Sequence, residues 1–127
     1  VGKEGFLPLT LNRQLIDFAD GKISYQGSQV PYRTPRAAEI WEVAEKAADV
    51  LGLRGYAGID FVLGEKPWAV DVNARPTTSI IGIARVMKEE IGELIVRARF
   101  GGLPERVHLE GESIFRKGDL ALKPDEQ

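Results

Sequence analysis

The chain of 127 residues has no cysteine, one histidine and one methionine. Without cysteine it has no disulfide, no thiolate metal site and no cysteine nucleophile, and a single histidine excludes a multi-histidine metal cage. A formal net charge of −2 gives no electrostatic reason to bind nucleic acid or an anionic membrane. No apolar run reaches the roughly 18–20 residues that span a bilayer. We therefore expect a cytoplasmic protein that uses neither nucleic acid nor a membrane as a partner.

The start of the chain, VGKEGFLPLT, has neither a signal-peptide core nor an initiator methionine. This start predicts a piece of a longer polypeptide. With 43% hydrophobic and 28% charged residues, the composition fits one globular domain over residues 1–127.

Leucines that alternate with other residues in FLPLTLNRQLIDF predict a first strand, with a bulge or bend near Asn12–Gln14 where the apolar parity changes. The stretch ADGK predicts a turn, and ISYQGSQVPY predicts an irregular second strand. TPRAAEIWEVAEKAADVLGL predicts a helix with Thr34 as its N-cap. The predicted core face of this helix is Ile40, Trp41, Ala44, Ala47, Ala48 and Leu51.

One or two further helices are predicted in TTSIIGIARVMKEEIGELIVRARFGG, ending at Gly101–Gly102. Short strands around Val107–Leu109 and Ser113–Phe115 and a polar tail follow, and His108 is interpreted as a surface strand residue without a catalytic role. The order β-β-α-β-β-α predicts an α+β fold, a largely antiparallel sheet with helices packed on one face. Such a sheet leaves its other face free for a ligand.

The stretch GIDFVLGEKPWAVDVNARP reads as a hairpin that turns around Gly64–Pro67. In that register the facing pairs are apolar and share one face, which specifies the register well. The predicted pairs are Leu63 with Trp68, Phe61 with Val70, and Ile59 with Val72. Trp68, like Trp41, is then predicted to lie in the core.

The same register places Asp60 directly opposite Asp71 on the other face, with Asn73 and Arg75 following at two-residue steps. Facing Cβ atoms lie about 4.5–5.5 Å apart, where like charges are destabilising. Two carboxylates at that distance share a proton or bracket a cation, the asparagine adds a neutral oxygen, and the arginine adds an anion-binding fork. These four side chains together predict a site for a Mg2+ ion that is bound to phosphate. A solvated polar face is the alternative.

At these residues the chain resembles the ATP-grasp superfamily. The carboxyl-terminal subdomain of that family carries an acid on one strand and an acid-x-Asn-x-Arg stretch on the next. GIDF with Asp60, and VDVNARP with Asp71, Asn73 and Arg75, match this pattern. The stretches LPLTLNRQLIDF, YQGSQVPY and RPTTSI look most like the archaeal-type ligases of the family. The resemblance covers about Leu7–Pro104 and is specific at Asp60–Thr78.

The resemblance implies roles for the matched residues. Asp60, Asp71 and Asn73 would hold the Mg2+ ions that bridge the phosphates of ATP, with Mn2+ as a possible substitute. Arg75 would be the catalytic residue that holds the acyl phosphate or its substrate.

Four more residues are candidates for binding the phosphates of ATP. Asn12 and Arg13 either reach the phosphates or cap a sheet edge. Thr77 and Thr78, with the following serine, form either an ordinary helix N-cap or a phosphate nest.

The implied activity is ATP-dependent ligation of a carboxylate to an amine through an acyl phosphate, with ATP and the two small molecules as partners. The lysines that grip the nucleotide in the family have no counterpart in this chain. We therefore expect a carboxyl-terminal portion that is inactive without the missing amino-terminal part of the same enzyme. A nucleotide- or metal-binding module without ligase chemistry, or a purely structural module, is the alternative.

Overall fold

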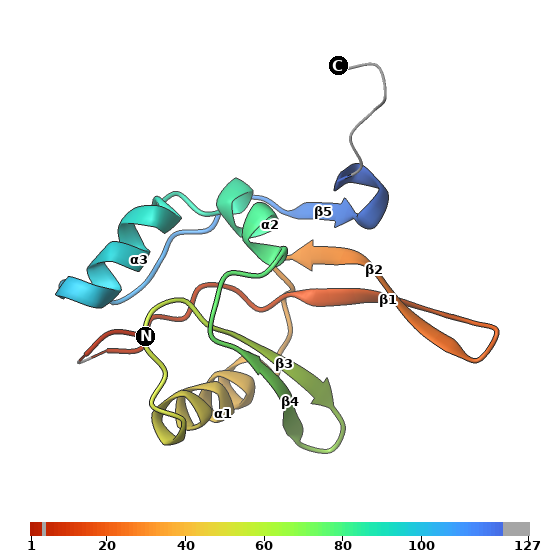
Figure 1. The fold of residues 1–127 in the computed structure, drawn as a ribbon, viewed down its shortest axis with the longest axis horizontal. Helices are drawn as coiled ribbons and strands as arrows, with labels where there is room; N and C mark the ends of the chain where they lie inside the picture. Colours follow the sequence, from red (N-terminus) through yellow and green to blue (C-terminus); the bar gives the residue numbers. More distant parts are fainter. Residues whose placement is uncertain (4, 121–127) are drawn as a thin grey trace.

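The computed structural model describes residues 1–3 and 5–120, and it confirms the predicted α+β class. Antiparallel strands and three α-helices alternate along the described residues (Figure 1). The polar tail predicted after Phe115 lies outside them from residue 121 onward. The elements are β1 (Arg13–Ala19), β2 (Lys22–Val30), α1 (Ala37–Val50), β3 (Gly58–Leu63), β4 (Pro67–Asn73), α2 (Ser79–Val86), α3 (Ile91–Phe100), β5 (Ser113–Arg116) and a 3-10 turn η1 (Lys117–Leu120).

The strands form two antiparallel sheets in place of the single sheet that the sequence predicted. One has the order β1-β2-β5, and the other is the β3–β4 hairpin. α1 packs against β4, and α2 packs against β2 and β5. The buried core joins β2 to the helices through Val30, Ile83, Val86, Met87, Ile91 and Leu94. None of the helices in the described residues is long and apolar enough to cross a membrane.

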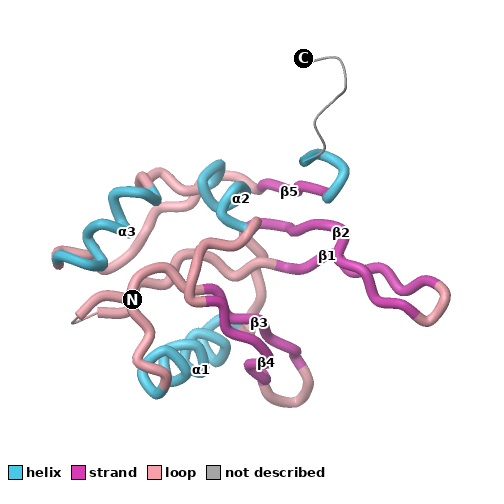
Figure 2. Tube along the Cα trace, viewed as in Figure 1, coloured by secondary structure: helices cyan, strands magenta, loops and turns pink. Residues whose placement is uncertain are grey.

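The first strand begins at Arg13, so its predicted start at Phe6 was wrong. Residues 6–12 have no ladder partner among the described residues and form a loop before β1 (Figure 2). The alternating leucines still serve the interior, because Leu7 and Leu9 pack against the core. The alternation of apolar and polar residues indicates which side of an extended segment is buried. It does not indicate whether a neighbouring strand pairs with that segment.

No bulge occurs near Asn12–Gln14 in the first strand, so that prediction was wrong; the bulge of this hairpin lies further along and in the partner strand. Leu15 pairs with Gly27 and Ile16 pairs with Tyr25, so Gln26 is the extra residue and β1 itself stays regular. The predicted turn is confirmed, because Asp20 and Gly21 both have positive φ angles, 52° and 70°, as a two-residue hairpin turn requires.

Gly27 lies beside this bulge and approaches β5 closely. Its φ angle is 154°, and a Cβ atom added there would overlap the carbonyl oxygen of Phe115. We expect Gly27→Ala to lower the free energy of unfolding by about 2–3 kcal/mol in urea denaturation, because backbone must shift to accept one methyl group. Gly92→Ala is the control, since Gly92 is helical with open space around it and alanine there should not destabilise. Equal stability of the two variants would contradict this packing.

The first helix begins at Ala37, later than predicted. Thr34 still acts near its start, because its Oγ1 accepts a hydrogen bond of 3.2 Å from the backbone N–H of Arg36. Ile40, Ala44 and Ala48 are buried as predicted. Leu51 was wrongly placed in the core face and is 57% exposed, because it follows the last turn of the helix.

The last predicted helical stretch is two helices, α2 and α3, separated at Met87–Glu90. Met87 leaves the helix with extended angles and forms a bridge to Leu109, which is all that remains of the first short strand predicted after α3. The Glu89 carboxylate accepts hydrogen bonds from the backbone N–H of His108 and pairs with its ring, and these contacts hold the pKa of Glu89 below its usual value. His108 is an exposed residue, and its contacts with Glu89 hold the connection between α2 and α3 in place.

Candidate functional site

The β3–β4 hairpin brings the two predicted carboxylates together. Asp60 faces Asp71, and the flanking pairs Ile59–Val72 and Gly58–Asn73 share the same register. Because alternate residues of a strand share a face, Asn73 lies on the face of the two aspartates. The central pairing predicted from the sequence is therefore confirmed.

Neither aspartate has a cationic partner in the described residues. One oxygen of Asp60 accepts a 3.1 Å hydrogen bond from the side-chain amide of Gln14, and one oxygen of Asp71 accepts a 2.9 Å bond from the backbone N–H of Val72. Each carboxylate thus keeps one oxygen outside the protein hydrogen bonds of the described residues. Two facing carboxylates without a cation are destabilising, so the pair is suited to a bound cation.

Beyond the aspartates the predicted register was wrong. Phe61 pairs with Ala69 and Val62 pairs with Trp68, so the two strands shift at Asp60/Phe61 and Val70 becomes an extra residue in β4. The predicted core position of Trp68 is corrected by the same shift: Trp68 is 61% exposed.

The shift changes what stands beside the carboxylates. Val62 follows Asp60 by two residues on a regular strand, so Val62 and its partner Trp68 lie on the carboxylate face. Val62 is 56% exposed. Helix α1 packs on the hairpin at β4. The carboxylate face of β3–β4 therefore carries an acidic pair and an exposed apolar pair side by side.

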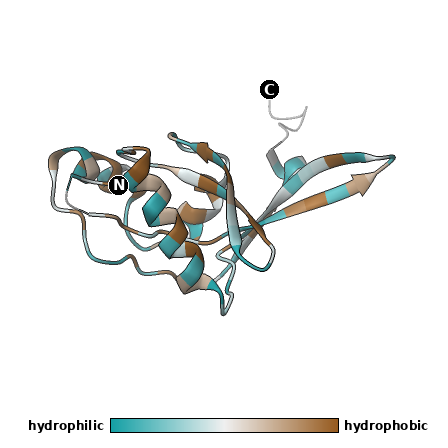
Figure 3. Cartoon of the chain, turned by 90° about the horizontal axis from the view of Figure 1, so that it is seen from below, coloured by the Kyte–Doolittle hydropathy of each residue, from teal (hydrophilic) through white to brown (hydrophobic). Residues whose placement is uncertain are grey.

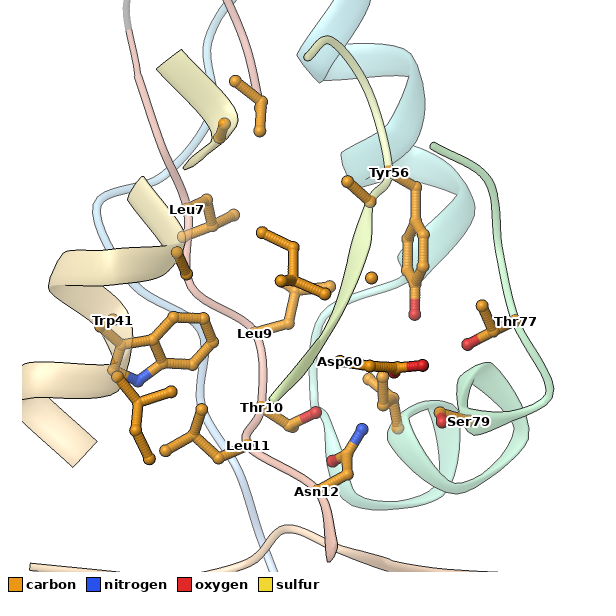
Figure 4. Close-up of a pocket in the computed structure, with 18 of the residues that line it drawn as sticks. Leu7, Leu9, Thr10, Leu11, Asn12, Trp41, Tyr56, Asp60, Thr77 and Ser79 are labelled. Atoms are coloured by element: carbon orange, nitrogen blue, oxygen red, sulfur yellow. The ribbon is translucent and has the colours of Figure 1, made fainter. Parts of the chain in front are cut away.

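A cavity of about 410 Å³ opens beside β3 and is lined by residues 6–7 and 9–14, by β3, and by helices α1, α2 and α3. Its side chains divide by character, with Leu7, Leu11 and Trp41 at one side and oxygen-bearing groups at the other (Figure 4). Trp41, predicted to be a core residue, is half-buried there, with its ring 6.2 Å from that of Phe6. The polar side holds Thr10, Asn12, Tyr56, Asp60, Thr77 and Ser79.

Two polar atoms at this end have no hydrogen-bond partner in the described residues. They are Thr10 Oγ1 and Asn12 Oδ1, and both are buried. Buried polar atoms are nearly always paired with protein, water or a ligand, so these two mark a place where a polar group fits. The Tyr56 phenol, whose pKa is raised by burial, lies at the same end and can donate a hydrogen bond.

The structure brings some of the predicted site residues together and leaves others apart. Asn12, Arg13, Asp60 and Thr77 line the cavity. Arg13 is exposed, and its guanidinium carbon lies 5.9 Å from the centre of the Tyr32 ring.

The remaining predicted residues lie on β4 or follow it, outside the cavity lining. Arg75 is exposed, donates a 3.2 Å hydrogen bond to the carbonyl oxygen of Pro76, and forms no salt bridge within residues 1–3 and 5–120. Thr78 is the N-cap of α2, but its side chain makes no capping hydrogen bond. Two roles were predicted for Thr78, an ordinary helix N-cap and part of a phosphate nest. Capping by its side chain is not observed.

Thr10, Gln14 and Tyr56 were missed in the sequence. The sequence pattern does indicate Thr10 and Gln14. Together with Asn12 they alternate with the leucines and form the polar side of one extended stretch. Tyr56 has no such signal.

The oxygen ligands fit Mg2+ on their own chemistry. Mg2+ in proteins is held by one or two carboxylates, keeps several waters and takes the rest of its ligands from substrate phosphates. Within the described residues no cluster of three or more acidic, histidine or cysteine residues could hold a metal. The candidate centre is therefore the smaller set that a phosphate-bound Mg2+ uses, Asp60, Asp71 and the amide oxygen of Asn73.

Comparison with known proteins agrees with the predicted resemblance. The ATP-grasp domain family matches residues 1–79, a range that contains every predicted site residue. The chain belongs to the ATP-grasp family. It is similar to tyramine–L-glutamate ligase of Methanocaldococcus fervens, with 33% identity over 98 residues, which confirms the resemblance to archaeal-type members.

That alignment covers 76% of this chain and 31% of the relative, so the chain spans about a third of the length of the ligase it matches. No match was found among the solved structures.

Proposed function

We propose that this chain is the Mg·ATP-binding portion of an ATP-dependent carboxylate–amine ligase. The observation that carries the proposal is the register of β3–β4, which sets Asp60 against Asp71 without a cationic partner in the described residues of an ATP-grasp family member. In the proposed site Asp60, Asp71 and Asn73 hold Mg2+. The ion supplies neutralisation of the charge on the phosphates of ATP.

The remaining roles follow from position and chemistry. The exposed guanidinium of Arg75 follows the same strand and supplies a two-pronged donor for the acyl phosphate or the substrate carboxylate. Asn12 and Arg13 at the cavity, together with Thr77 and Thr78 at the start of α2, are proposed to contact the phosphates. The exposed Val62–Trp68 pair beside the carboxylates gives an apolar surface of the kind that a planar base stacks on.

The proposed reaction is two successive displacements. A substrate carboxylate oxygen attacks the terminal phosphorus of ATP, and ADP leaves. An amine nitrogen then attacks the acyl carbon, phosphate leaves with the electrons of the broken C–O bond, and the nitrogen loses a proton as the amide forms. The residues of this chain contribute orientation and charge stabilisation, which are the larger part of catalysis in phosphoryl transfer.

The proposal has a direct test in ADP formation. The complete ligase that contains this chain should form ADP continuously with Mg2+ only when both a carboxylate and an amine are present. With the carboxylate alone it should stop after a single turnover, because ADP leaves before the amine reacts. The 127 residues alone should form none, because the nucleotide-gripping lysines of the family are absent from them. ADP formation by the isolated chain that depends on an amine and a carboxylate would show that the chain does not need the rest of the enzyme. Absence of such ADP formation in the complete protein would overturn the ligase function.

A further inference from the structure

The β3–β4 hairpin lies beside α1 and pairs in two registers along its length (Figures 1 and 3). Its inner half sets Asp60 against Asp71, whereas its tip is shifted by one residue and leaves Val70 as the extra residue of β4. A hairpin without this bulge would keep the two aspartates opposite each other and would pair Val70 as well. A contact outside the strand pairing therefore has to favour the bulge.

The choice of register decides where Trp68 lies. In the observed hairpin residues 64–66 connect the strands, and Trp68 pairs with Val62 on the carboxylate face. Without the bulge the connection would be residues 64–67, and Trp68 would pair with Leu63 on the opposite face. Only the bulged register therefore places the exposed Trp68 beside the two aspartates.

Arg36, the N-cap residue of α1, holds the turn of this hairpin. Its Nη1 donates a 2.8 Å hydrogen bond to the carbonyl oxygen of Gly64, and its Nη2 donates a 3.1 Å hydrogen bond to the carbonyl oxygen of Glu65. Its Nε pairs with the carboxylate of Glu39 in the first turn of α1. The guanidinium is thus fixed to the helix along one edge and to two successive carbonyl groups of the turn along another.

The rigid fork of a guanidinium favours one backbone geometry of the turn. Two carbonyl groups that accept from the same planar group need a fixed spacing and direction, and turns of three and four residues direct their carbonyls differently. The Trp68 ring lies against the same turn, since a Cβ atom added to Gly64 would lie 3.9 Å from the indole Nε1. The turn that Arg36 holds is therefore also the backbone against which Trp68 packs.

We propose that Arg36 is a positioning residue for the ligand, because its grip on the three-residue turn keeps the bulged register and so keeps Trp68 on the carboxylate face. The inference rests on the proposed function in one respect, namely that a nucleotide base stacks on Trp68. The two aspartates face each other in either register. Arg36 therefore acts on the binding of the base and not on the carboxylate pair.

NMR of the 127-residue chain measures the register without any ligand. Cross-strand NOEs should join Trp68 to Val62 in the wild type and to Leu63 in Arg36→Ala, while those between the two aspartates remain in both. Arg33→Ala is the control, because Arg33 is an exposed arginine three residues earlier, and it should keep the wild-type contacts. Unchanged contacts in Arg36→Ala would overturn the proposal. Loss of the contacts between the aspartates would overturn it too, because Arg36 would then hold the whole hairpin.

Removal of Val70 gives a matched rescue. Without this residue every observed pair of the hairpin can form with no bulge, so Trp68 should stay opposite Val62 whether or not Arg36 is present. Arg36→Ala in this shortened chain should therefore show the wild-type NOEs. A move of Trp68 to Leu63 in the shortened chain would contradict a role of Arg36 in holding the bulge.

Kinetics of the proposed ligase test the consequence for the ligand. Arg36→Ala should raise KM for ATP about tenfold and change kcat less than about twofold, because the base loses its stacking surface while the carboxylate pair remains. Removal of Val70 in the same variant should restore KM. An unchanged KM in a variant whose register has moved would overturn the role of Arg36 in ligand binding. Absence of ADP formation in the wild-type ligase would instead overturn the proposed function, whereas the NMR result decides the register in either case.

Discussion

Replacing Arg75 with lysine is expected to lower turnover of the proposed ligase about 100-fold while the fold stays intact. The guanidinium is exposed, and its hydrogen bond in the described structure goes to the carbonyl oxygen of the next residue, Pro76. Little of the folded state therefore depends on it. Lysine keeps the positive charge but loses the planar fork that binds a phosphate or carboxylate through two parallel hydrogen bonds.

Steady-state kinetics measure the loss of turnover, and thermal unfolding of the same preparation measures whether the fold stays intact. Arg99→Lys is the control, because Arg99 is an exposed arginine on α3 whose guanidinium lies over the Phe100 ring. It should keep wild-type turnover. Full activity in Arg75→Lys would reduce Arg75 to an ordinary surface charge and remove the arginine from the proposed mechanism.

The part of the site that could be predicted from the sequence is the part governed by strand alternation. Ile59 and Val72 place one face of the hairpin in the interior, and that choice forces Asp60 and Asp71 onto the other face, opposite each other. This holds only as far as the alternation is unbroken. At Val70 one residue is left out of the pairing, and an extra apolar residue looks in the sequence like any other member of an apolar strand.

The consequence of that extra residue was the largest error at the site. Trp68 is large and apolar, so a sequence rule places it inside, whereas the shifted register turns it to the carboxylate face. An exposed tryptophan beside two acids offers a surface on which the ring of a ligand can stack, and a buried tryptophan does not.

The cavity beside β3 could not be predicted, because it depends on contacts between distant segments. Residues 6–12 were recognised as extended and amphipathic, but pairing with a neighbour is a tertiary property. The bond from Gln14 to Asp60 joins positions 46 residues apart, and nothing in the local pattern of either residue indicates it.

Replacing Asp60 with asparagine should leave the metal-free chain as stable as the wild type, or slightly more stable. The change removes one of two facing like charges, and an asparagine side-chain oxygen can still accept the hydrogen bond from Gln14. Asp60 forms no salt bridge in the described residues whose loss would offset this gain. A clear loss in the free energy of unfolding would show that Asp60 is held by a structural contact.

Binding of a divalent cation between the two strands is tested most directly by NMR of the 127-residue chain titrated with Mn2+. Mn2+ accepts the same oxygen ligands as Mg2+ and broadens the signals of nearby amides. We expect broadening first at the amides of Asp60, Asp71 and Asn73, its loss in Asp60→Asn, and its retention in the control Asp49→Asn on the exposed face of α1. Broadening that begins elsewhere, or that persists in Asp60→Asn, would contradict a paired-carboxylate metal site on the β3–β4 hairpin.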